Sequence, residues 1–352
     1  MKVLIVGSLS NYAIERFYLK YLNKNLFDSV ECKVFTAQDV FLKFYNRSVI
    51  NKLAFRIGYR DIYVMINEKL KAELDKYQPD HLLVFKGMEV FPSTLQYAID
   101  RKINIINYNP DNPFIFSGSG SGNENVSESI KMYDLHFSYN LQVRDRIEED
   151  YGIPCGWLPF GFEVDEKVYH HCLSEKEIVK ACFIGNPDHI RANFIKEIAE
   201  EGIKIDVFGY KWNSFLNHKN ITLYNSVFGE EFWKNLHRYR VQLNPLRIHN
   251  LNSHAMRSFE VPAIGGIMLA ARTAEHEMFF NEFSECFYYD NTVDAIQNIK
   301  DILSLTHNEA KEIRNNARQR SLDSYYSYKC RAGQFLSMLN QFKNRHQILK
   351  VI

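Results

Sequence analysis

Long apolar segments and an excess of charge of one sign are both missing from this sequence. No run approaches 18 uninterrupted apolar residues, so we expect no membrane-spanning helix. Lysine and arginine number 43 and aspartate and glutamate 42, and a net charge of +1 argues against a dedicated nucleic-acid binder. The apolar run at the N-terminus ends at Gly7 and charges return at Glu15, which favours a buried first strand over an export signal.

Paired cysteines are also missing. The six cysteines are scattered and form no C-x-x-C pair, which predicts reduced, mostly buried thiols in a cytoplasmic protein and no metal site. The G-x-G-x-x-G pattern of classical dinucleotide sites is absent as well. At 352 residues the chain is long enough for two domains that each bury a core.

Short β-branched runs alternate with longer amphipathic stretches throughout the chain, which is typical of parallel α/β domains. The first-half strand candidates are Lys2–Val6, Glu31–Phe35, His81–Phe85, Ile103–Asn107, Leu135–Ser138 and Cys155–Leu158. A second start near Val179 leads to Lys204–Phe208, Ile221–Tyr224, Val241–Leu243, Gly266–Ala270 and Cys286–Tyr289. We therefore expect two Rossmann-like domains facing a cleft, 1–160 and 161–325, and a C-terminal helix (326–352) that could pack back on the first.

Two glycine-containing turns in the second half are candidate phosphate sites. In FIGNPDHIRANF, Gly185 and Asn186 end a strand, and Arg191 lies one turn into the next helix, whose N-terminus would attract phosphate. In VFGYKW, Gly209 follows a strand, so that Tyr210 could stack on a base and Lys211 could meet a phosphate. Ordinary strand-to-helix turns explain both patterns equally well.

The strongest pattern is QLNPLRIHNLNSHAMRSFEVPAIGGIMLAART. A strand ends at Asn244, and we expect a helix to open near Ser253 and to carry His254, Arg257 and Glu260 along one side. Two cations and a carboxylate in series suit a nucleoside diphosphate, with the positive groups at the phosphates and the carboxylate at the ribose hydroxyls. Spacing alone equally fits a solvated helix face with an internal Arg–Glu pair.

The same stretch resembles the C-terminal domain of the CgeB-like bacterial glycosyltransferases. The resemblance rests on Leu243-Asn244, Met256-Arg257-Ser258-Phe259-Glu260, Ala263 and Gly265-Gly266. It implies a GT-B fold and a nucleoside-diphosphate-sugar donor, with Asn244, Met256, Arg257 and Glu260 at the donor and no obligatory metal. In the larger, retaining family 4 a glutamate matching Glu260 binds the donor ribose. A second glutamate, usual eight positions earlier in that family, is Asn252 here.

The N-terminal half is then the candidate acceptor domain. Gly7 and Asn11 follow the first strand, and Lys86 follows the third, so all three fall at strand ends where an acceptor could approach. Asp111 is the candidate general base for an inverting transfer, and His254 the second candidate catalytic residue. A turn-forming aspartate between two prolines is the alternative interpretation of Asp111.

Two further segments of the first half are unusual. Residues 113–125 are rich in glycine and serine and predict a mobile loop, either a lid over the site or a surface connection. Residues 43–60 hold five lysine or arginine residues and no acidic one, with apolar residues at helical spacing. They predict an interfacial helix for peripheral membrane contact or, alternatively, a core-packing helix with a basic outer face.

These observations predict a cytoplasmic, metal-independent hexosyltransferase with no cofactor besides its nucleotide-sugar donor. The acceptor would be a glycan or lipid-linked sugar of bacterial surface polysaccharide synthesis, and retention is favoured over inversion. Two alternatives stay open: a nucleotide-sugar epimerase on the same fold, and a non-catalytic two-lobed ligand-binding protein.

Overall fold

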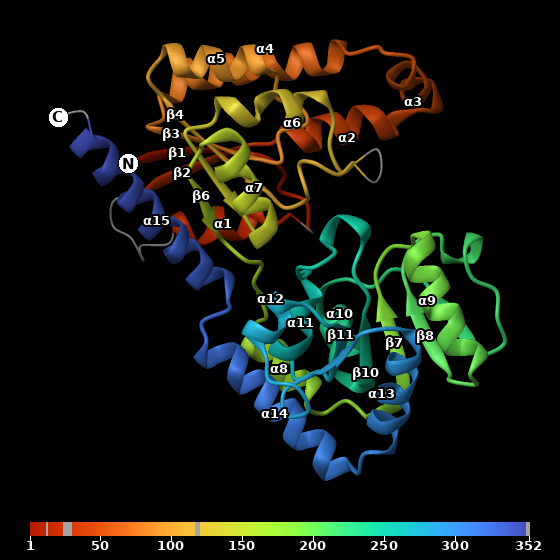
Figure 1. Ribbon diagram of the computed structural model, residues 1–352. Coiled ribbons are helices and arrows are strands. Elements are labelled where there is room, and N and C mark those ends of the chain that lie inside the picture. The colour runs from red at the N-terminus through yellow and green to blue at the C-terminus, as the bar shows by residue number, and fades with distance from the viewer. Residues whose placement is uncertain (12, 24–29, 117–119, 350–352) are drawn as a thin grey trace. The chain divides into compact units, whose positions relative to one another are not determined.

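The computed structural model describes residues 1–11, 13–23, 30–116 and 120–349, with side chains up to residue 342. The chain divides into two compact units, Met1–Pro159 together with the chain from Tyr328 onward, and Phe160–Ser327. Each contains one six-stranded parallel sheet with helices on both faces (Figure 1). None of the helices in the described ranges is long and apolar enough to cross a membrane.

The first unit has the strand order β2-β1-β3-β4-β5-β6. Its strands are β1 (Lys2–Val6), β2 (Glu31–Phe35), β3 (His81–Phe85), β4 (Asn104–Asn109), β5 (Leu135–Ser138) and β6 (Cys155–Trp157). Its helices are α1 (Glu15–Asn23), α2 (Ala37–Arg47), α3 (Val49–Arg56), α4 (Asp61–Tyr77), α5 (Pro92–Asp100), α6 (Glu124–Ser129), α7 (Leu141–Tyr151) and α15 (Tyr328–Leu349).

Alternate residues of the first sheet face two different cores. Leu4, Leu82 and Ile105 pack under α4 and α5. On the opposite face, Tyr18 of α1 lies against Phe85 and Tyr108 of the sheet and against Phe335 of α15, with ring centroids 5.6, 6.0 and 6.1 Å apart. The C-terminal helix thus completes one face of the N-terminal unit (Figure 1).

The second unit repeats the plan with the strand order β12-β11-β10-β7-β8-β9. Its strands are β7 (Ile178–Ile184), β8 (Ile205–Phe208), β9 (Ile221–Tyr224), β10 (Tyr239–Asn244), β11 (Met268–Ala271) and β12 (Phe287–Tyr289). Its helices are α8 (Glu166–Cys172), α9 (His189–Glu200), α10 (Gly229–Arg238), α11 (Arg257–Ala263), α12 (Ala274–Phe279), α13 (Thr292–Ser304) and α14 (His307–Asp323). Because β10, β7 and β8 are neighbours, the loops after them lie together at the carboxyl edge of the sheet.

Two segments differ from the sequence expectation. The segment 43–60 is not one helix, because α2 ends at Arg47 and Ser48 caps the start of α3 by accepting the Asn51 N–H. The loop of residues 113–125 is described only in part, since residues 117–119 lie outside the described residues, and its last two residues already belong to α6.

Candidate functional site

Two glycines bring the loops after β7 and β8 into contact at the carboxyl edge of the second sheet. A Cβ built on Gly209 would lie 2.1 Å from the carbonyl oxygen of Gly185. The indole Nε1 of Trp212 donates a hydrogen bond of 2.7 Å to the same oxygen. No side chain larger than hydrogen fits at position 209, so the backbone itself lines this edge. The sequence pattern around Gly209 did not indicate this contribution of Trp212.

Two arginines lie at the carboxylate of Asp188 before the start of α9, and the charge of a third acts on one of them. Asp188 caps α9 by accepting the Arg191 N–H at 2.9 Å, and its other oxygen accepts from Arg191 Nε at 2.7 Å. Arg247 Nε, from the loop after β10, lies 3.8 Å from that second oxygen. Arg257 completes the group, since its charge acts on the guanidinium of Arg191. We call Arg191, Arg247 and Arg257 the arginine cluster.

The arginine cluster is short of negative charge. Burial, together with the neighbouring charges of Arg247 and Arg257, lowers the pKa of Arg191 to about 10, against the opposite effect of Asp188. Arg191 is only 8% exposed, and its Nη2 has no hydrogen-bond partner in the described part of the chain; Arg257 Nε also lacks one. A buried charged donor without an acceptor is costly, so the cluster has the properties of an anion-binding site.

Arg257 and Glu260 lie on the first turn of α11 and form an ion pair. The guanidinium of Arg257 lies over the ring of Phe232, 4.4 Å from its centroid. Glu260 is 8% exposed, and Met256, just before the helix, is half-buried. This ion pair is the internal Arg–Glu contact that the sequence spacing allowed. Because Arg257 also belongs to the arginine cluster, it links Glu260 to that cluster. A ribose-binding role for Glu260 stays a prediction.

The expected position of His254 is wrong. Helix α11 begins at Arg257, not near Ser253, so His254 precedes the helix and does not share its face. Its ring is fully buried: Nε2 accepts the Phe160 N–H at 3.3 Å, and Nδ1 donates to Glu275 Oε2 at 2.5 Å. Because both nitrogens hold the protein together away from solvent, we do not retain His254 as a catalytic residue.

Asn244 fixes the start of α11. Its amide donates to Ser258 Oγ at 3.1 Å, and the Ser258 hydroxyl donates to His276 Nε2 at 2.7 Å. Burial lowers the pKa of His276 to about 4, so its ring is neutral, with Nδ1 donating to the Ala271 carbonyl at 2.7 Å. The buried network connects β10 to α11 and thereby positions Arg257, while Asn244 itself is 3% exposed.

The remaining predicted donor residues lie on the surface. Asn186 and Tyr210 are exposed, Tyr210 by 67%. Lys211 has a φ of 65°, and its Nζ lies 5.1 Å from the Tyr210 ring centroid. Asn252, where family 4 usually has glutamate, has a φ of 64°, a left-handed conformation that asparagine tolerates better than glutamate does.

The carboxyl edge of the first sheet carries the predicted acceptor residues. Lys86 Nζ lies 2.5 Å from Asp111 Oδ2 and donates to the Gly120 carbonyl at 2.6 Å. The Asp111 N–H donates to Asn109 Oδ1 at 3.0 Å, so the side chain of Asn109 forms the turn. Lys86 and Asp111 therefore come together as an ion pair, and Lys86 also anchors the glycine-rich loop. Asn11 is exposed.

The sequence patterns did not indicate two buried carboxyl groups at this edge, those of Glu15 and Glu89. Glu15 of α1 accepts the Ser8 N–H at 3.2 Å, and burial raises its pKa to about 7. A Cβ on Gly7 would lie 2.6 Å from a Glu15 oxygen, so the glycine makes room for this carboxyl group. Burial likewise raises the pKa of Glu89 to about 7, against the opposing charge of Lys86. In the sequence, only their positions shortly after a strand distinguish these two glutamates from others.

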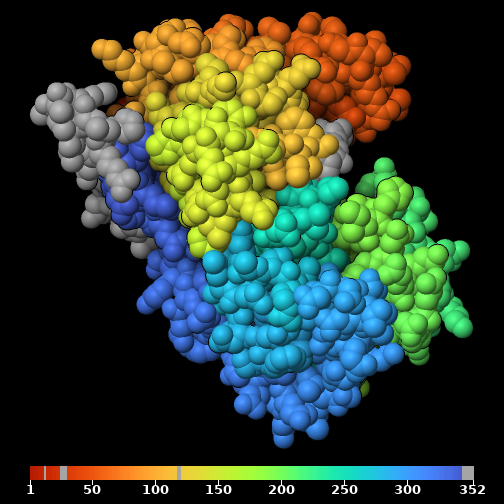
Figure 2. Space-filling view, viewed as in Figure 1, coloured from red at the N-terminus to blue at the C-terminus, as the bar shows by residue number. Residues whose placement is uncertain are grey.

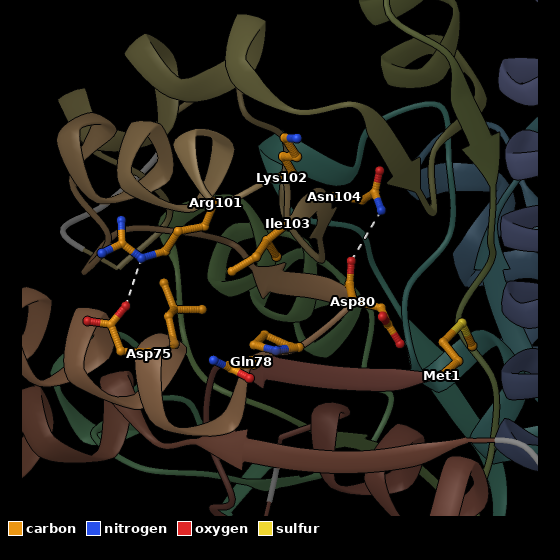
Figure 3. A pocket seen from close by; sticks show the side chains of 10 residues that line it. Met1, Asp75, Gln78, Asp80, Arg101, Lys102, Ile103 and Asn104 are labelled. Carbon is orange, nitrogen blue, oxygen red and sulfur yellow. Dashed lines mark hydrogen bonds and ion pairs between the residues drawn. The ribbon is translucent and has the colours of Figure 1, made fainter. Parts of the chain in front are cut away.

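The first unit also has a hollow of about 730 Å³ at the opposite, amino edge of its sheet (Figure 3). Figure 3 shows Arg101 paired with Asp75, at 2.7 Å, and the Asn104 amide donating to the Asp80 carbonyl, at 3.2 Å. These polar groups already have partners, and ligands of parallel sheets bind at the carboxyl edge. We therefore place the candidate functional residues of each unit at the carboxyl edge of its own sheet. No group of three or more potential metal ligands occurs in the ranges that the structure describes.

Comparison with known proteins identifies the fold. Sucrose-phosphate synthase from Thermosynechococcus elongatus superposes with a TM-score of 0.68 and 10% identity, over 98% of this chain and 100% of that one. Anabaena HepE in complex with UDP gives 0.63 and 10%, over 97% and 100%. The UDP-GlcNAc 2-epimerase from Neisseria meningitidis bound to UDP-GlcNAc gives 0.58 and 14%, over 97% and 100%.

Sequence comparison is informative for the second half of the chain. No curated protein has a significant match to the sequence. The model of a glycosyl transferase-like family matches residues 191–337, which contain all three members of the arginine cluster together with Glu260. The chain therefore has the GT-B fold, and its residues 191–337 are glycosyl transferase-like.

Proposed function

We propose that this protein transfers a sugar from a nucleoside-diphosphate sugar to a glycan or lipid-linked acceptor in bacterial surface polysaccharide synthesis, as a CgeB-like glycosyltransferase. The arginine cluster carries the proposal, because Arg191 is a buried cation whose Nη2 has no acceptor among the residues that the structure describes. The glycosyl transferase-like match over residues 191–337 and the fold shared with a UDP-bound protein support it.

In this proposal the second unit binds the donor. The diphosphate would take the hydrogen bonds that Arg191 Nη2 and Arg257 Nε lack, and the backbone at Gly185 and Gly209 lets it approach closely. Glu260 would accept from the ribose hydroxyls once the donor draws Arg257 toward the phosphates. Tyr210 and Lys211 remain candidates for the outer edge of the site, where a base could stack.

The transfer breaks the bond between the anomeric carbon and the diphosphate oxygen and forms one to the acceptor hydroxyl oxygen. The arginines stabilise the negative charge that develops on the leaving diphosphate, which a metal would otherwise do. The acceptor proton goes to the donor phosphate in a retaining transfer, or to Asp111 in an inverting one. We favour retention because Asp111, the base that an inverting transfer would need, is already engaged in an ion pair with Lys86.

Thermal-shift measurements with UDP, GDP and dTDP test the donor site. We expect one of them to raise the melting temperature of the full chain. Arg191→Gln and Glu260→Ala should each weaken the affinity for that nucleotide at least about tenfold, since each removes a charged partner worth about 2 kcal/mol. Arg146→Gln, which removes an exposed guanidinium from α7 of the other unit, is the matched control and should bind normally. No response to any nucleotide would contradict the proposal.

Product analysis separates transfer from epimerisation, which the similar fold of the UDP-GlcNAc 2-epimerase favours as a second candidate. The nucleotide sugar that binds is incubated without acceptor, and its sugar is identified. An isomerised sugar would assign the epimerase. Sugar transferred to an added glycan acceptor supports the transferase, and binding without turnover of any kind supports a two-lobed binding protein.

A further inference from the structure

Helix α3 carries a row of aliphatic side chains on the surface of the first unit. Val49, Ile50, Leu53 and Ile57, just past its end, are 81%, 76%, 59% and 78% exposed, and none of the helix's residues is buried. Scattered single apolar residues are normal on protein surfaces, but four large ones on adjacent turns form a continuous patch. We call these four residues the α3 ridge.

The opposite side of α3 is firmly attached. The ring of Phe55 packs between Phe41 and Tyr63, with centroid distances of 4.9 and 5.4 Å. The amide of Asn51 donates to the Phe44 carbonyl at 2.7 Å. The core-packing alternative of the sequence analysis therefore holds for Phe55 and is wrong for the ridge. The helix is held in place with its apolar side facing outward.

The segment that carries the ridge is basic. Segment 43–60 contains no acidic residue, and Lys43, Arg47 and Arg56 are exposed. Arg60 lies over the Phe55 ring, 4.2 Å from its centroid, and donates to the Phe55 carbonyl at 2.5 Å, which secures the end of the helix. In Figure 1, α3 lies at the end of the helical layer away from the strands, and Figure 2 shows this orange-red region at the surface.

We propose that the α3 ridge inserts into the headgroup region of an anionic lipid bilayer, with Lys43, Arg47 and Arg56 on the acidic headgroups. The bilayer satisfies both features at once, because aliphatic side chains partition into the acyl boundary while basic residues bind anionic lipid. A protein partner would have to match the ridge with an apolar hollow rimmed by carboxylates. This surface belongs to the first unit and is independent of the proposed donor chemistry.

Vesicle cosedimentation of the full chain tests the proposal. We compare vesicles of phosphatidylcholine with 30% phosphatidylglycerol against pure phosphatidylcholine, and expect binding to the first that weakens with salt. Ile50→Ser with Ile57→Ser, and separately Lys43→Gln with Arg47→Gln and Arg56→Gln, should each reduce the partition coefficient at least about tenfold, since each basic residue contributes about fivefold. Val293→Ser, at an equally exposed aliphatic side chain of the second unit, should bind like wild type.

Three outcomes would overturn the proposal: equal binding of the ridge variant and wild type, equal binding to both vesicle types, or no binding to either. A concentration-dependent dimer that the ridge variant abolishes would instead assign the ridge to a second copy of the chain. Since the substituted side chains are exposed, the variants should keep the wild-type melting temperature, and nucleotide binding should be unchanged. A failed donor-binding test would therefore leave this result interpretable.

Discussion

The carboxyl edges of the two sheets have the same topological origin and opposite chemistry. In the second unit, Arg191, Arg247 and Arg257 outnumber the carboxylates of Asp188 and Glu260 that touch them. At the carboxyl edge of the first sheet, Glu15 and Glu89 are buried carboxyl groups, and Lys86 forms an ion pair with Asp111. One fold thus presents a cationic edge on one unit and a largely acidic edge on the other.

The same architecture can therefore support different chemistry in its two copies. Parallel strands supply the same set of loop positions in both units, but the charge at those positions is set by only a few side chains. A cationic edge suits a diphosphate. An edge whose buried carboxyl groups have raised pKa values suits the exchange of protons or hydrogen bonds with hydroxyl groups.

The largest expected effect is the pH dependence of the acidic edge. Burial raises the pKa of Glu15 from 4.5 to about 7, so between these values the unfolded chain loses a proton that the folded protein keeps. Stability therefore falls as the pH rises from about 4.5 to 7. Glu15→Gln should remove roughly 3 kcal/mol of that fall, measured as urea unfolding free energies across the window.

Glu128→Gln, at an exposed position of α6, is the matched control and should leave the wild-type pH profile unchanged. If wild type and Glu15→Gln lose stability in parallel across this pH range, Glu15 is not protonated in the folded protein and the description of the acidic edge is wrong.

A somewhat smaller effect is expected when a glycine at each of the two edges is replaced by alanine. Ala at position 209 would place its Cβ 2.1 Å from the Gly185 carbonyl oxygen, which is backbone, so Gly209→Ala should cost about 2 to 3 kcal/mol of unfolding free energy. Gly7→Ala meets the end of the Glu15 side chain instead, which can shift, and should cost less. Chemical denaturation of both variants at pH 6 measures the difference, and a reversed order would refute it.

The smallest effect concerns the ion pair of the first unit. Lys86→Met removes the partner of Asp111, whose side chain is 21% exposed, and should cost about 1 kcal/mol, because water partly replaces the lost contact. The charge of Lys86 also lowers the pKa values of Glu15 and Glu89. Their pKa values should therefore rise above 7 in the variant, which extends the pH-dependent loss of stability upward in the same unfolding measurements. An unchanged window would contradict this coupling.

Much of the fold follows from local pattern. Each predicted strand overlaps an observed strand, because the short β-branched runs, bounded by turn residues, recur with the spacing of an α/β sheet. Gly265, with a φ of 74°, ends α11 in the way that the Gly-Gly turn indicated. These features depend on a few neighbouring residues, so one sequence suffices to read them.

The site was harder to predict from the sequence than the fold. A helix was expected from Ser253, but it begins four residues later at Arg257, and His254 lies in the core before the helix. Arg247 was not singled out, because nothing local distinguishes it from any loop arginine. The exposed side of α3 likewise depends on which face Phe55 attaches to the unit.

Local sequence was enough to predict the alternation of strands and helices, the glycines at the strand ends and the lack of acidic residues in segment 43–60. The folded chain was needed to show that Arg191 and Arg247 meet at Asp188 and that the buried Arg191 Nη2 has no acceptor within the described ranges. The physical reason is range: backbone preferences act over a few residues, whereas charge coupling and burial depend on which distant segments the strand order brings together.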